Sequence, residues 1–326
     1  MDKMRAIQLT KPTEAKDIIF TECVIPKVKP GWVLVKIKAF GMNHSEQILR
    51  KTEIDASYIK KPIILGIECA GEIADVSDNS YIVGQKVIAF MGGMGRSFDG
   101  SYAEFALLPV SHVFLVNTKF SWEQLAAVPE TYFTAWCSLF ECLQLKPKDK
   151  LLIRGGTCAL GFAAIQLAKA FGCKIIATTH RKEKISLLQN CGADIVLLDD
   201  GSLKGKCFGV TKALELVGPK TLKDTMESVE KNAVVCNTGV LGGEYIINGF
   251  DPIKDIPNRV YLTGFYSNNP TQNVMDNIFN FLESHQLLPC IGKVFPFEKI
   301  REACDAIDSG TVNGKIVITA EDRTVK

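Results

Sequence analysis

The chain has few histidines and almost no net charge. It contains 4 histidines in 326 residues; none is spaced as in His-x-x-x-His, and no two cysteines form Cys-x-x-Cys. No strong metal-binding motif is therefore present. Lysine and arginine exceed aspartate and glutamate by 38 − 36 = 2. So small a balance, spread along the chain, argues against a nucleic-acid or membrane-surface protein.

Long apolar runs are also absent. No stretch reaches the ~18 apolar residues that a transmembrane helix needs, and the opening residues MDKMRAIQLTKP become polar too early for a signal peptide. The eleven cysteines are scattered through strand-like and helix-like segments rather than clustered in loops. This distribution predicts reduced, mostly buried thiols, and we expect a cytoplasmic protein with no nucleic-acid or membrane partner.

The length of the chain and its pattern of apolar runs predict two domains. The composition, 47% hydrophobic and 23% charged, is that of an ordinary globular protein, and 326 residues suit two cores. Up to about residue 120, short runs such as 32–40, 71–76 and 85–90 are broken by glycine and proline, which is typical of an all-β module. The more polar segment 44–60 is expected to be helix or loop.

The middle of the chain alternates strand and helix. The expected elements are strands at 150–156, 173–179, 194–200, 213–218, 233–239 and 260–266, with helices at 160–172, 181–190 and 219–231. Alternation with short connections predicts parallel strands and a doubly wound α/β sheet. From 268 the chain shows two helical patterns and one strand at 314–319, too little to fold alone. We therefore predict a discontinuous domain of 1–122 and 268–326 around a dinucleotide-binding domain of 123–267.

A glycine-bearing turn at 153–161 is the most informative segment. It follows a strand and opens a helix, so its N–H groups and the helix dipole would face a pyrophosphate. The Gly-x-Gly-x-x-Gly fingerprint falls on Gly156, Cys158 and Gly161, so the middle glycine is missing. The flanking strand and helix support a dinucleotide site all the same. The alternative is a tight turn that holds no ligand.

The end of the next strand bears on which dinucleotide binds. The sequence there is ATTHRKEK (177–184), without the acid that usually binds the ribose hydroxyls of NAD. Hydroxyls and cations at this position would bind a 2′-phosphate, so Thr179, His180, Arg181 and Lys184 favour NADPH. The alternative is the solvated start of a surface helix.

Two further loops that follow strands are candidates to line the nicotinamide. They would do so through Gly239, Val240, Leu241, Phe265 and Tyr266.

Eight short segments in a fixed order resemble the medium-chain dehydrogenase/reductase superfamily, specifically its zinc-independent quinone oxidoreductase branch. They are FGMNHSEQ (40–47), ILGIECAGEI (64–73), VGQKV (83–87), FDGSYAEFALLP (98–109), PETYFTAW (129–136), the turn at 155–161, ALELVG (213–218) and GKIVIT (314–319). The resemblance spans nearly the whole chain. It implies a GroES-like, mostly β catalytic domain and a Rossmann domain, with the active cleft between them.

The zinc ligands of the superfamily's alcohol dehydrogenases are missing by this resemblance. Asn43 takes the place of a cysteine ligand, and Ile67 replaces the histidine of a Gly-His-Glu motif that ends in Glu68. Residues 91–110 hold no cysteine for a structural zinc. A carbonyl would then lack a Lewis acid, which favours acceptors that spread the incoming charge by conjugation. The reaction implied is hydride transfer from NADPH to a quinone or an α,β-unsaturated carbonyl.

The resemblance also implies roles for individual residues. Asn43 would lie near the nicotinamide and substrate, Ser45 would relay a proton, and Thr134 would line the nicotinamide pocket; loop stabilisation or helix packing are the alternatives. The residues expected to bind the cofactor are Thr131, Gly155, Gly156, Thr157, Cys158, Ala159, Leu160, Gly161, Thr179, His180, Arg181, Lys184, Gly239, Val240, Leu241, Phe265, Tyr266 and Lys315.

Two other functions stay open at this point. One is an acryloyl- or enoyl-thioester reductase of the same branch, and the other is an NADPH-binding redox sensor without turnover. The strongly β-prone segment VYLTGFY (260–266) would serve as a dimer edge in this family, so a homodimer is expected.

Overall fold

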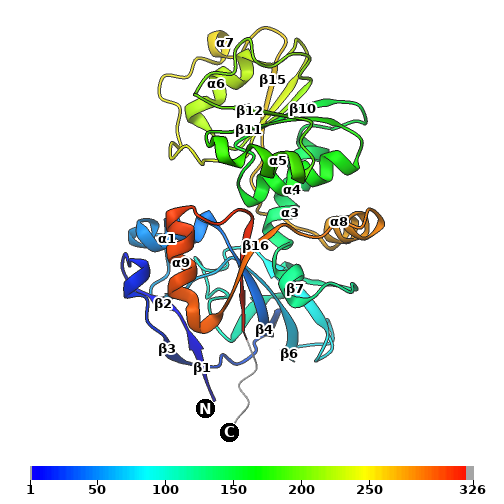
Figure 1. Cartoon of the computed structure of the whole chain (residues 1–326). Coiled ribbons are helices and arrows are strands. Elements are labelled where there is room, and N and C mark those ends of the chain that lie inside the picture. The colour runs from blue at the N-terminus through cyan, green and yellow to red at the C-terminus, as the bar shows by residue number, and fades with distance from the viewer. Residues whose placement is uncertain (1, 321–326) are drawn as a thin grey trace. The chain divides into compact units, whose positions relative to one another are not determined.

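The computed structural model describes residues 2–320, which form two compact units (Figure 1). Of the described residues, unit 1 comprises 2–130 and 268–320, and unit 2 comprises Thr131–Ser267. The first boundary lies eight residues beyond the expected 122/123. The reason is that α2 (Trp122–Ala126) packs on strands β4 (Trp32–Met42) and β6 (Glu68–Val76) of unit 1. The second boundary lies between residues 267 and 268.

Unit 2 is built on a six-stranded sheet in which every neighbouring pair is parallel. In spatial order its strands are β12 (Ile195–Leu198), β11 (Lys174–Thr179), β10 (Lys150–Arg154), β13 (Lys212–Glu215), β14 (Val234–Asn237) and β15 (Tyr261–Gly264). This order reverses direction between β10 and β13, where doubly wound sheets bind ligands. The predicted Rossmann-type α/β fold is confirmed.

Helices cover both faces of this sheet, as Figure 1 shows. They are α4 (Ala159–Ala170) and α5 (Ile185–Cys191) on one face and α6 (Pro219–Glu227) on the other. Leu222 and Met226 of α6 pack on Leu152 and Val235 of the sheet. The shorter elements of unit 2 are the π-helical turn η4 (Cys137–Cys142), η5 (Lys182–Lys184) and α7 (Pro252–Asp255), and α3 (Pro129–Trp136) leads into it.

Unit 1 is mostly β structure. Its main sheet runs β16 (Ile291–Pro296), β17 (Lys315–Thr319), β4, β6, β7 (Lys86–Phe90) and β9 (Val113–Leu115), and β8 (Phe105–Pro109) also pairs with β4. Two small sheets pair β1 (Lys3–Ala6) with β3 (Thr21–Val24), and β2 (Gln8–Leu9) with β5 (Ile63–Ile64). Its helices are α1 (His44–Lys51), α2, α8 (Gln272–Ser284) and α9 (Ile300–Ser309), with 3-10 turns η1 (Ala15–Asp17), η2 (Glu53–Asp55), η3 (Val110–His112) and η6 (Phe297–Lys299).

Strand β16 was not expected from the sequence. Only Phe295 of this strand is fully buried, because β16 is the edge strand and leaves residues 292–294 exposed. An exposed edge strand lacks the alternation of apolar and polar residues that predicts a strand. Between residues 2 and 320, no helix is both long enough and apolar enough to span a membrane.

Candidate functional site

A buried polar cluster gathers around Asn43 in unit 1. Its members, called the Asn43 cluster below, are Asn43, Glu46, Glu68 and Lys315. Asn43 follows β4 and is the N-cap of α1, while Glu68 begins β6, which pairs with β4. Lys315 begins β17, whose Ile316 pairs with Met42 of β4, so the register brings the lysine beside Asn43. Three adjacent strands thus deliver these side chains to one place.

Lys315 is the cation of this cluster. Its Nζ lies 2.5 Å from Glu68 Oε1 and donates to Asn43 Oδ1 at 2.6 Å. Asn43 Nδ2 donates to Glu68 Oε1 at 2.8 Å, and the backbone N–H of Glu130 donates to Glu68 Oε2 at 2.8 Å. Lys315 and Glu68 are both buried, so each depends on the other for charge compensation.

Gly41 makes room for this ion pair. A Cβ at Gly41 would lie 2.4 Å from Glu68 Oε1, 2.5 Å from Lys315 Cε and 2.6 Å from the carbonyl oxygen of Ala126. Real Cβ atoms do not approach other atoms so closely, and the third neighbour is backbone, which cannot rotate away. The glycine therefore lets strand β4 pass directly under the ion pair.

Glu46 adds a second carboxylate to the cluster. It is buried, accepts from the backbone N–H of Asn43 at 2.8 Å, and so closes the first turn of α1. Burial and the nearby charge of Glu68 together raise the pKa of Glu46 to about 7, while Lys315 opposes the change. One ammonium thus faces two carboxylates, and the second of them holds a proton near neutral pH.

The amide of Asn43 is largely occupied by this cluster. Its Nδ2 faces Glu68 and, at 3.3 Å, Glu46, while its Oδ1 faces Lys315. The reverse orientation would set the amide oxygen against two carboxylates, so the charges fix it. The Asn43 side chain also caps the first turn of α1 by facing the backbone N–H of Glu46. Asn43 therefore has no free N–H to donate.

The superfamily's catalytic zinc does not fit these residues. The resemblance puts Asn43 and the apolar, buried Ile67 at two ligand positions, and the ammonium of Lys315 lies against Glu68 and Asn43 oxygens. Zinc is held by cysteine, histidine and carboxylate ligands, and an ammonium within hydrogen-bond distance repels a cation. Within residues 2–320, no three histidine, cysteine, aspartate or glutamate side chains gather as a metal site would require.

Ser45, the predicted proton relay, lies on α1 with its hydroxyl in another contact. Its Oγ accepts from Arg96 at 3.2 Å, and Arg96 also forms an ion pair with Glu53 at 2.7 Å. The structure therefore places Ser45 next to the Asn43 cluster in sequence, but with a different hydrogen-bond partner.

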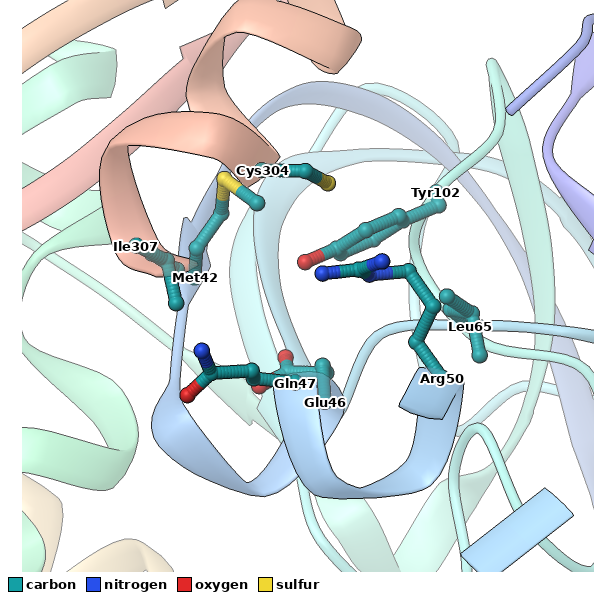
Figure 2. Close-up of a pocket in the computed structure, with 8 residues that line it drawn as sticks. All are labelled: Met42, Glu46, Gln47, Arg50, Leu65, Tyr102, Cys304 and Ile307. Atoms are coloured by element: carbon teal, nitrogen blue, oxygen red, sulfur yellow. The ribbon is translucent and has the colours of Figure 1, made fainter. Parts of the chain in front are cut away.

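A small pocket on the inner side of α1 is shown in Figure 2. It is lined by Met42, Glu46, Gln47, Arg50, Leu65, Tyr102, Cys304 and Ile307. Arg50 is buried beside the Tyr102 ring and binds both carboxylate oxygens of Asp308 at 2.6 Å. This ion pair joins α1 to α9, so the pocket's charged groups serve to anchor the helix that begins at Asn43.

The glycine-bearing turn of unit 2 has the geometry that a dinucleotide site requires. Gly155 has φ +84°, a conformation that favours glycine, and its N–H donates to Thr178 Oγ1 at 3.1 Å. A Cβ at Gly161 would lie 2.4 Å from the carbonyl oxygen of Gly156, so only glycine lets α4 begin this close to the turn. Gly155, directly before the fingerprint, and Gly161, its third glycine, are thus needed, and the turn fits a pyrophosphate.

Cys158 explains how the middle glycine can be absent. Its backbone is extended, with φ −93° and ψ 168°, so any residue can adopt it. Its Sγ accepts from the N–H of Gly161 at 3.3 Å and thereby caps α4. Burial raises the pKa of this thiol, so it stays protonated.

The end of β11, which the sequence predicts to favour NADPH, is followed by the cations Arg181 and Lys184. Thr179 is buried and its Oγ1 accepts from the backbone N–H of Arg181 at 3.1 Å, while Arg181 Nε lies 3.3 Å from His180 Nε2. Within the described part of the chain, neither Arg181 nor Lys184 forms an ion pair with a carboxylate. Burial and the charge of Arg181 lower the pKa of Lys184, while the carboxylate of Glu183 opposes the change.

The loop after β14 approaches the glycine turn. A Cβ at Gly239 would lie 2.1 Å from the carbonyl oxygen of Leu216, and Leu241 lies next to Gly155. Asn237, which ends β14, keeps a buried Oδ1 that has no hydrogen-bond partner among the described residues. An unsatisfied acceptor at the carboxyl end of a parallel strand fits an amide-bearing ligand such as nicotinamide.

The remaining predicted residues divide between the two units. In unit 2, Phe265 packs edge-on against Phe133 with ring centroids 5.8 Å apart, and Tyr266 is exposed. Thr131 and Thr134 are buried at α3. Thr157, Ala159, Leu160 and Val240 are half-buried around the turn and its neighbouring loop. Lys315 belongs to unit 1 and the Asn43 cluster.

Sequence reasoning missed Glu46, Arg154 and Asn237 as members of these sites. Glu46 had a readable signal, because Asn43 followed three residues later by a glutamate is a capping pattern. Arg154 is a charged residue that directly follows the apolar run Leu151–Ile153 of a buried strand, which signals a buried ion pair. Nothing in the sequence distinguished Asn237 from other strand-end asparagines.

Comparison with known proteins agrees with this geometry. Residues 29–118 match the family model described as an alcohol dehydrogenase GroES-like domain, and residues 159–284 match the one described as a zinc-binding dehydrogenase. A human quinone oxidoreductase is 26% identical over 312 residues, covering 91% of this chain and 92% of the relative.

Solved structures show the same fold. The quinone oxidoreductase from Coxiella burnetii superposes with a TM-score of 0.84 at 20% identity, covering 98% of this chain and 100% of that one. The mycobacterial protein Rv1454c, solved in complex with NADPH, has a TM-score of 0.83 at 22% identity, covering 97% and 100%. The two family models together cover more than half of the chain, which belongs to the quinone oxidoreductase branch of the medium-chain dehydrogenase/reductase superfamily, whose members are oxidoreductases that use a nicotinamide cofactor.

Proposed function

We propose that this protein is a zinc-independent oxidoreductase that transfers a hydride from NADPH to a quinone or an α,β-unsaturated carbonyl. The observation that carries the cofactor choice is the end of β11. There, Arg181 and Lys184 form no ion pair with a carboxylate among the described residues, and the strand itself ends in threonines where an NAD site usually has an acid. A 2′-phosphate would supply the missing negative charge.

The donor set of the Asn43 cluster supports the substrate class. Without zinc, a simple aldehyde would lack the polarisation that stabilises its developing oxyanion. Quinones and conjugated carbonyls spread the incoming negative charge over several atoms and need less help. The human relative is named a quinone oxidoreductase, in keeping with this choice.

Each unit contributes its own residues to this proposal. In unit 2, the turn at 155–161 holds the pyrophosphate and Thr134 lines the nicotinamide pocket. NADPH supplies the hydride when bound. In unit 1, Asn43 and Ser45 contact the substrate. Because both N–H groups of its amide face carboxylates, Asn43 has no N–H left to polarise a carbonyl.

A paired titration tests the proposal. Purified protein is titrated with NADPH and with NADH by cofactor fluorescence, and 1,4-benzoquinone is then added to the bound complex. We expect tighter binding of NADPH and quinone-dependent loss of its absorbance. If an enoyl thioester, but not a quinone, oxidises the bound cofactor, the protein is a thioester reductase instead. If neither does so, it binds NADPH as a sensor, and failure to bind either dinucleotide overturns the cofactor assignment.

The edge of the unit 2 sheet supports the further proposal of a homodimer. Within the described residues β15 pairs only with β14, and its Tyr261 is exposed. An exposed edge strand of this kind pairs readily with a second copy. Light scattering should give a dimer for the native protein, and Tyr261→Lys should shift it toward monomer. A monomeric native protein would exclude this assembly.

A further inference from the structure

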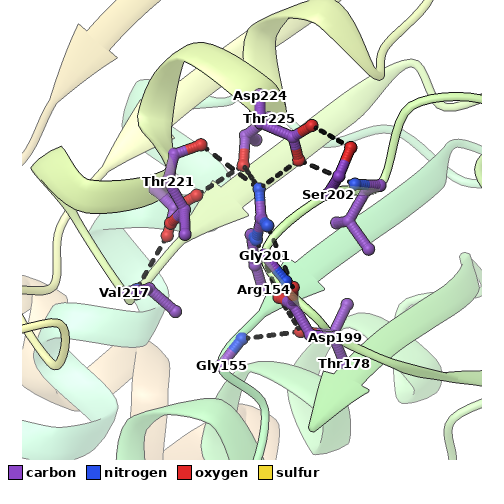
Figure 3. Close-up of polar contacts among 12 residues, drawn as sticks. Arg154, Gly155, Thr178, Asp199, Gly201, Ser202, Val217, Thr221, Asp224 and Thr225 are labelled. Atoms are coloured by element: carbon purple, nitrogen blue, oxygen red, sulfur yellow. Dashed lines mark hydrogen bonds and ion pairs between the residues drawn. The ribbon is translucent and has the colours of Figure 1, made fainter. Parts of the chain in front are cut away.

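Arg154 is a buried cation at the carboxyl end of β10, directly before the glycine turn. Its side chain has no exposed surface, and Figure 3 shows it at the centre of a polar network. Its Nε and Nη2 bind the two oxygens of Asp199 at 2.8 and 3.0 Å. Its Nη1 binds Asp224 at 2.7 Å and Thr225 Oγ1 at 3.0 Å. The guanidinium therefore holds Asp199 through the paired geometry that is strongest for carboxylates.

Asp199 lies at the corner of the sheet where the dinucleotide's adenosine half is expected. It follows β12, and its backbone N–H donates to the carbonyl oxygen of Thr179 at 2.8 Å. Its Oδ2 also accepts from Thr178 Oγ1 at 3.3 Å, and the same hydroxyl accepts from the N–H of Gly155. The carboxylate thus touches both the end of β11 and, through Thr178, the phosphate-binding turn.

At this position the charge of Asp199 can affect the relative affinity for NADPH and NADH. Strand β11 itself ends without an acid, yet Asp199 brings one to the same corner from the neighbouring strand. Asp199 is ionised, because the Arg154 guanidinium beside it holds the pKa of that carboxyl below its usual value. An unpaired carboxylate here would repel a 2′-phosphate while leaving a ribose hydroxyl unaffected.

We propose that Arg154 is a specificity-determining residue for the dinucleotide: by pairing with Asp199 it compensates a buried negative charge that would otherwise disfavour NADPH at the end of β11. The proposal rests on the proposed NADPH dependence. Arg154 acts through Asp199 and is a positioning residue rather than a catalytic one.

The other charges around Arg154 do not replace this function. Asp224 uses its Oδ2 for Arg154 and for the backbone N–H of Leu203 at 2.8 Å, and its Oδ1 for Ser202 Oγ at 2.8 Å. Glu215 is buried and caps the turn that follows β13 through the N–H of Val217 at 2.7 Å. Neither carboxylate is placed against Thr178 or Thr179, so Asp199 is the acid that Arg154 must neutralise for a phosphate at β11.

Dissociation constants for NADPH and NADH, measured for each of a set of variants, test the proposal. We expect Arg154→Met to weaken NADPH by about tenfold relative to NADH, the size of one uncompensated charge acting over ~10 Å of protein. The double variant R154M/D199N should recover the native ratio, because it removes the exposed charge together with its partner. Asp199→Asn alone should raise the preference for NADPH. Arg259→Met, the same change at an exposed arginine before β15, should leave the ratio unchanged.

Equal weakening of both dinucleotides in R154M would overturn the proposal and leave Arg154 as a structural brace. Should R154M fail to fold, D199N and the double variant decide alone: an NADPH preference that D199N leaves unchanged or lowers contradicts the proposal. The ratio of NADPH to NADH affinity in the native protein distinguishes failure of the proposed cofactor from failure of the proposed role of Arg154. A native preference for NADH overturns the proposed cofactor, whereas a native preference for NADPH that no variant alters overturns only the role of Arg154. Native protein that binds neither dinucleotide overturns both.

Discussion

Lys315 Nζ lies 2.5 Å from Glu68 Oε1, and the two side chains have relative exposures of only 2% and 0%. In this fold a protein cation, rather than a metal, compensates the buried glutamate. Because Glu46 adds a second carboxylate, the pair does not balance the cluster by itself. The ion pair therefore makes the cluster sensitive both to loss of the cation and to pH.

Replacement of Lys315 should lower the free energy of unfolding more than replacement of Glu68. Lys315→Met leaves two buried carboxylates without compensation, and breaking a buried pair costs about 3–5 kcal/mol. Glu68→Gln leaves Lys315 with Glu46 and should cost less. Urea unfolding checks this order, with Lys27→Met at an exposed site as the control that should change little. If both variants lower the free energy of unfolding equally and only slightly, Lys315 does not compensate both carboxylates.

Stability should fall as pH rises through the range in which Glu46 loses its proton. The pKa is raised from an ordinary 4.5 to about 7 in the folded protein, so the folded state binds the proton more tightly. Between these values the unfolded chain has already released its proton, and folding stability falls as pH increases. Since one pKa unit corresponds to about 1.4 kcal/mol, the free energy of unfolding falls by roughly 3 kcal/mol by pH 8.

The Glu46→Gln variant isolates this effect. It keeps an acceptor oxygen for the backbone N–H of Asn43 but cannot titrate. Melting temperatures measured from pH 5 to pH 8.5 should show a shallower decline for E46Q than for the native protein. Parallel curves for the two proteins would show that another group causes the decline.

Charge reversal at the end of β11 should act on NADPH selectively. Arg181→Asp replaces a candidate phosphate ligand by a repelling carboxylate. Because hydrogen bonds to charged groups contribute about 1.5–3 kcal/mol, NADPH should bind at least about tenfold more weakly. NADH should change much less. Lys174→Asp, at the exposed start of the same strand, is the matched control. Equal effects on both dinucleotides would refute the 2′-phosphate site.

Activity should not depend on zinc. Asn43 and Ile67 stand at two ligand positions, and Lys315 lies where a cation would be repelled. Metal analysis of purified protein should find far less than stoichiometric zinc, and prolonged treatment with a chelator should leave quinone turnover unchanged. Stoichiometric zinc whose removal abolishes turnover would contradict the metal-free site.

Local patterns predicted the sheet of unit 2 well. Its strands are parallel and buried, so they appear as apolar runs separated by helices, and the glycine turn lies where the flanking strand and helix required. The expected position of Gly161 is matched by a contact that only glycine allows. Edge strand β16 escaped notice because exposure removes the apolar pattern on which such predictions depend.

Ion pairs between residues far apart in the sequence could not be predicted from the sequence. Lys315 and Glu68 are separated by most of the chain, and their contact depends on the register of β17 against β4. Arg154 and Asp199 lie at the ends of two strands that are separated in the sheet by β11. Neither pairing follows from spacing along the sequence, because both are set by tertiary packing.

The most direct test of hydride transfer is a single-turnover reaction of the NADPH complex with 1,4-benzoquinone, followed at the absorbance of reduced nicotinamide. NADPH deuterated at the transferred position is compared with the unlabelled cofactor. We predict stoichiometric formation of NADP⁺ and hydroquinone, with slower oxidation of the deuterated cofactor. No oxidation, or a rate that the enzyme does not increase above the reaction in buffer, would contradict a reductase acting on quinones.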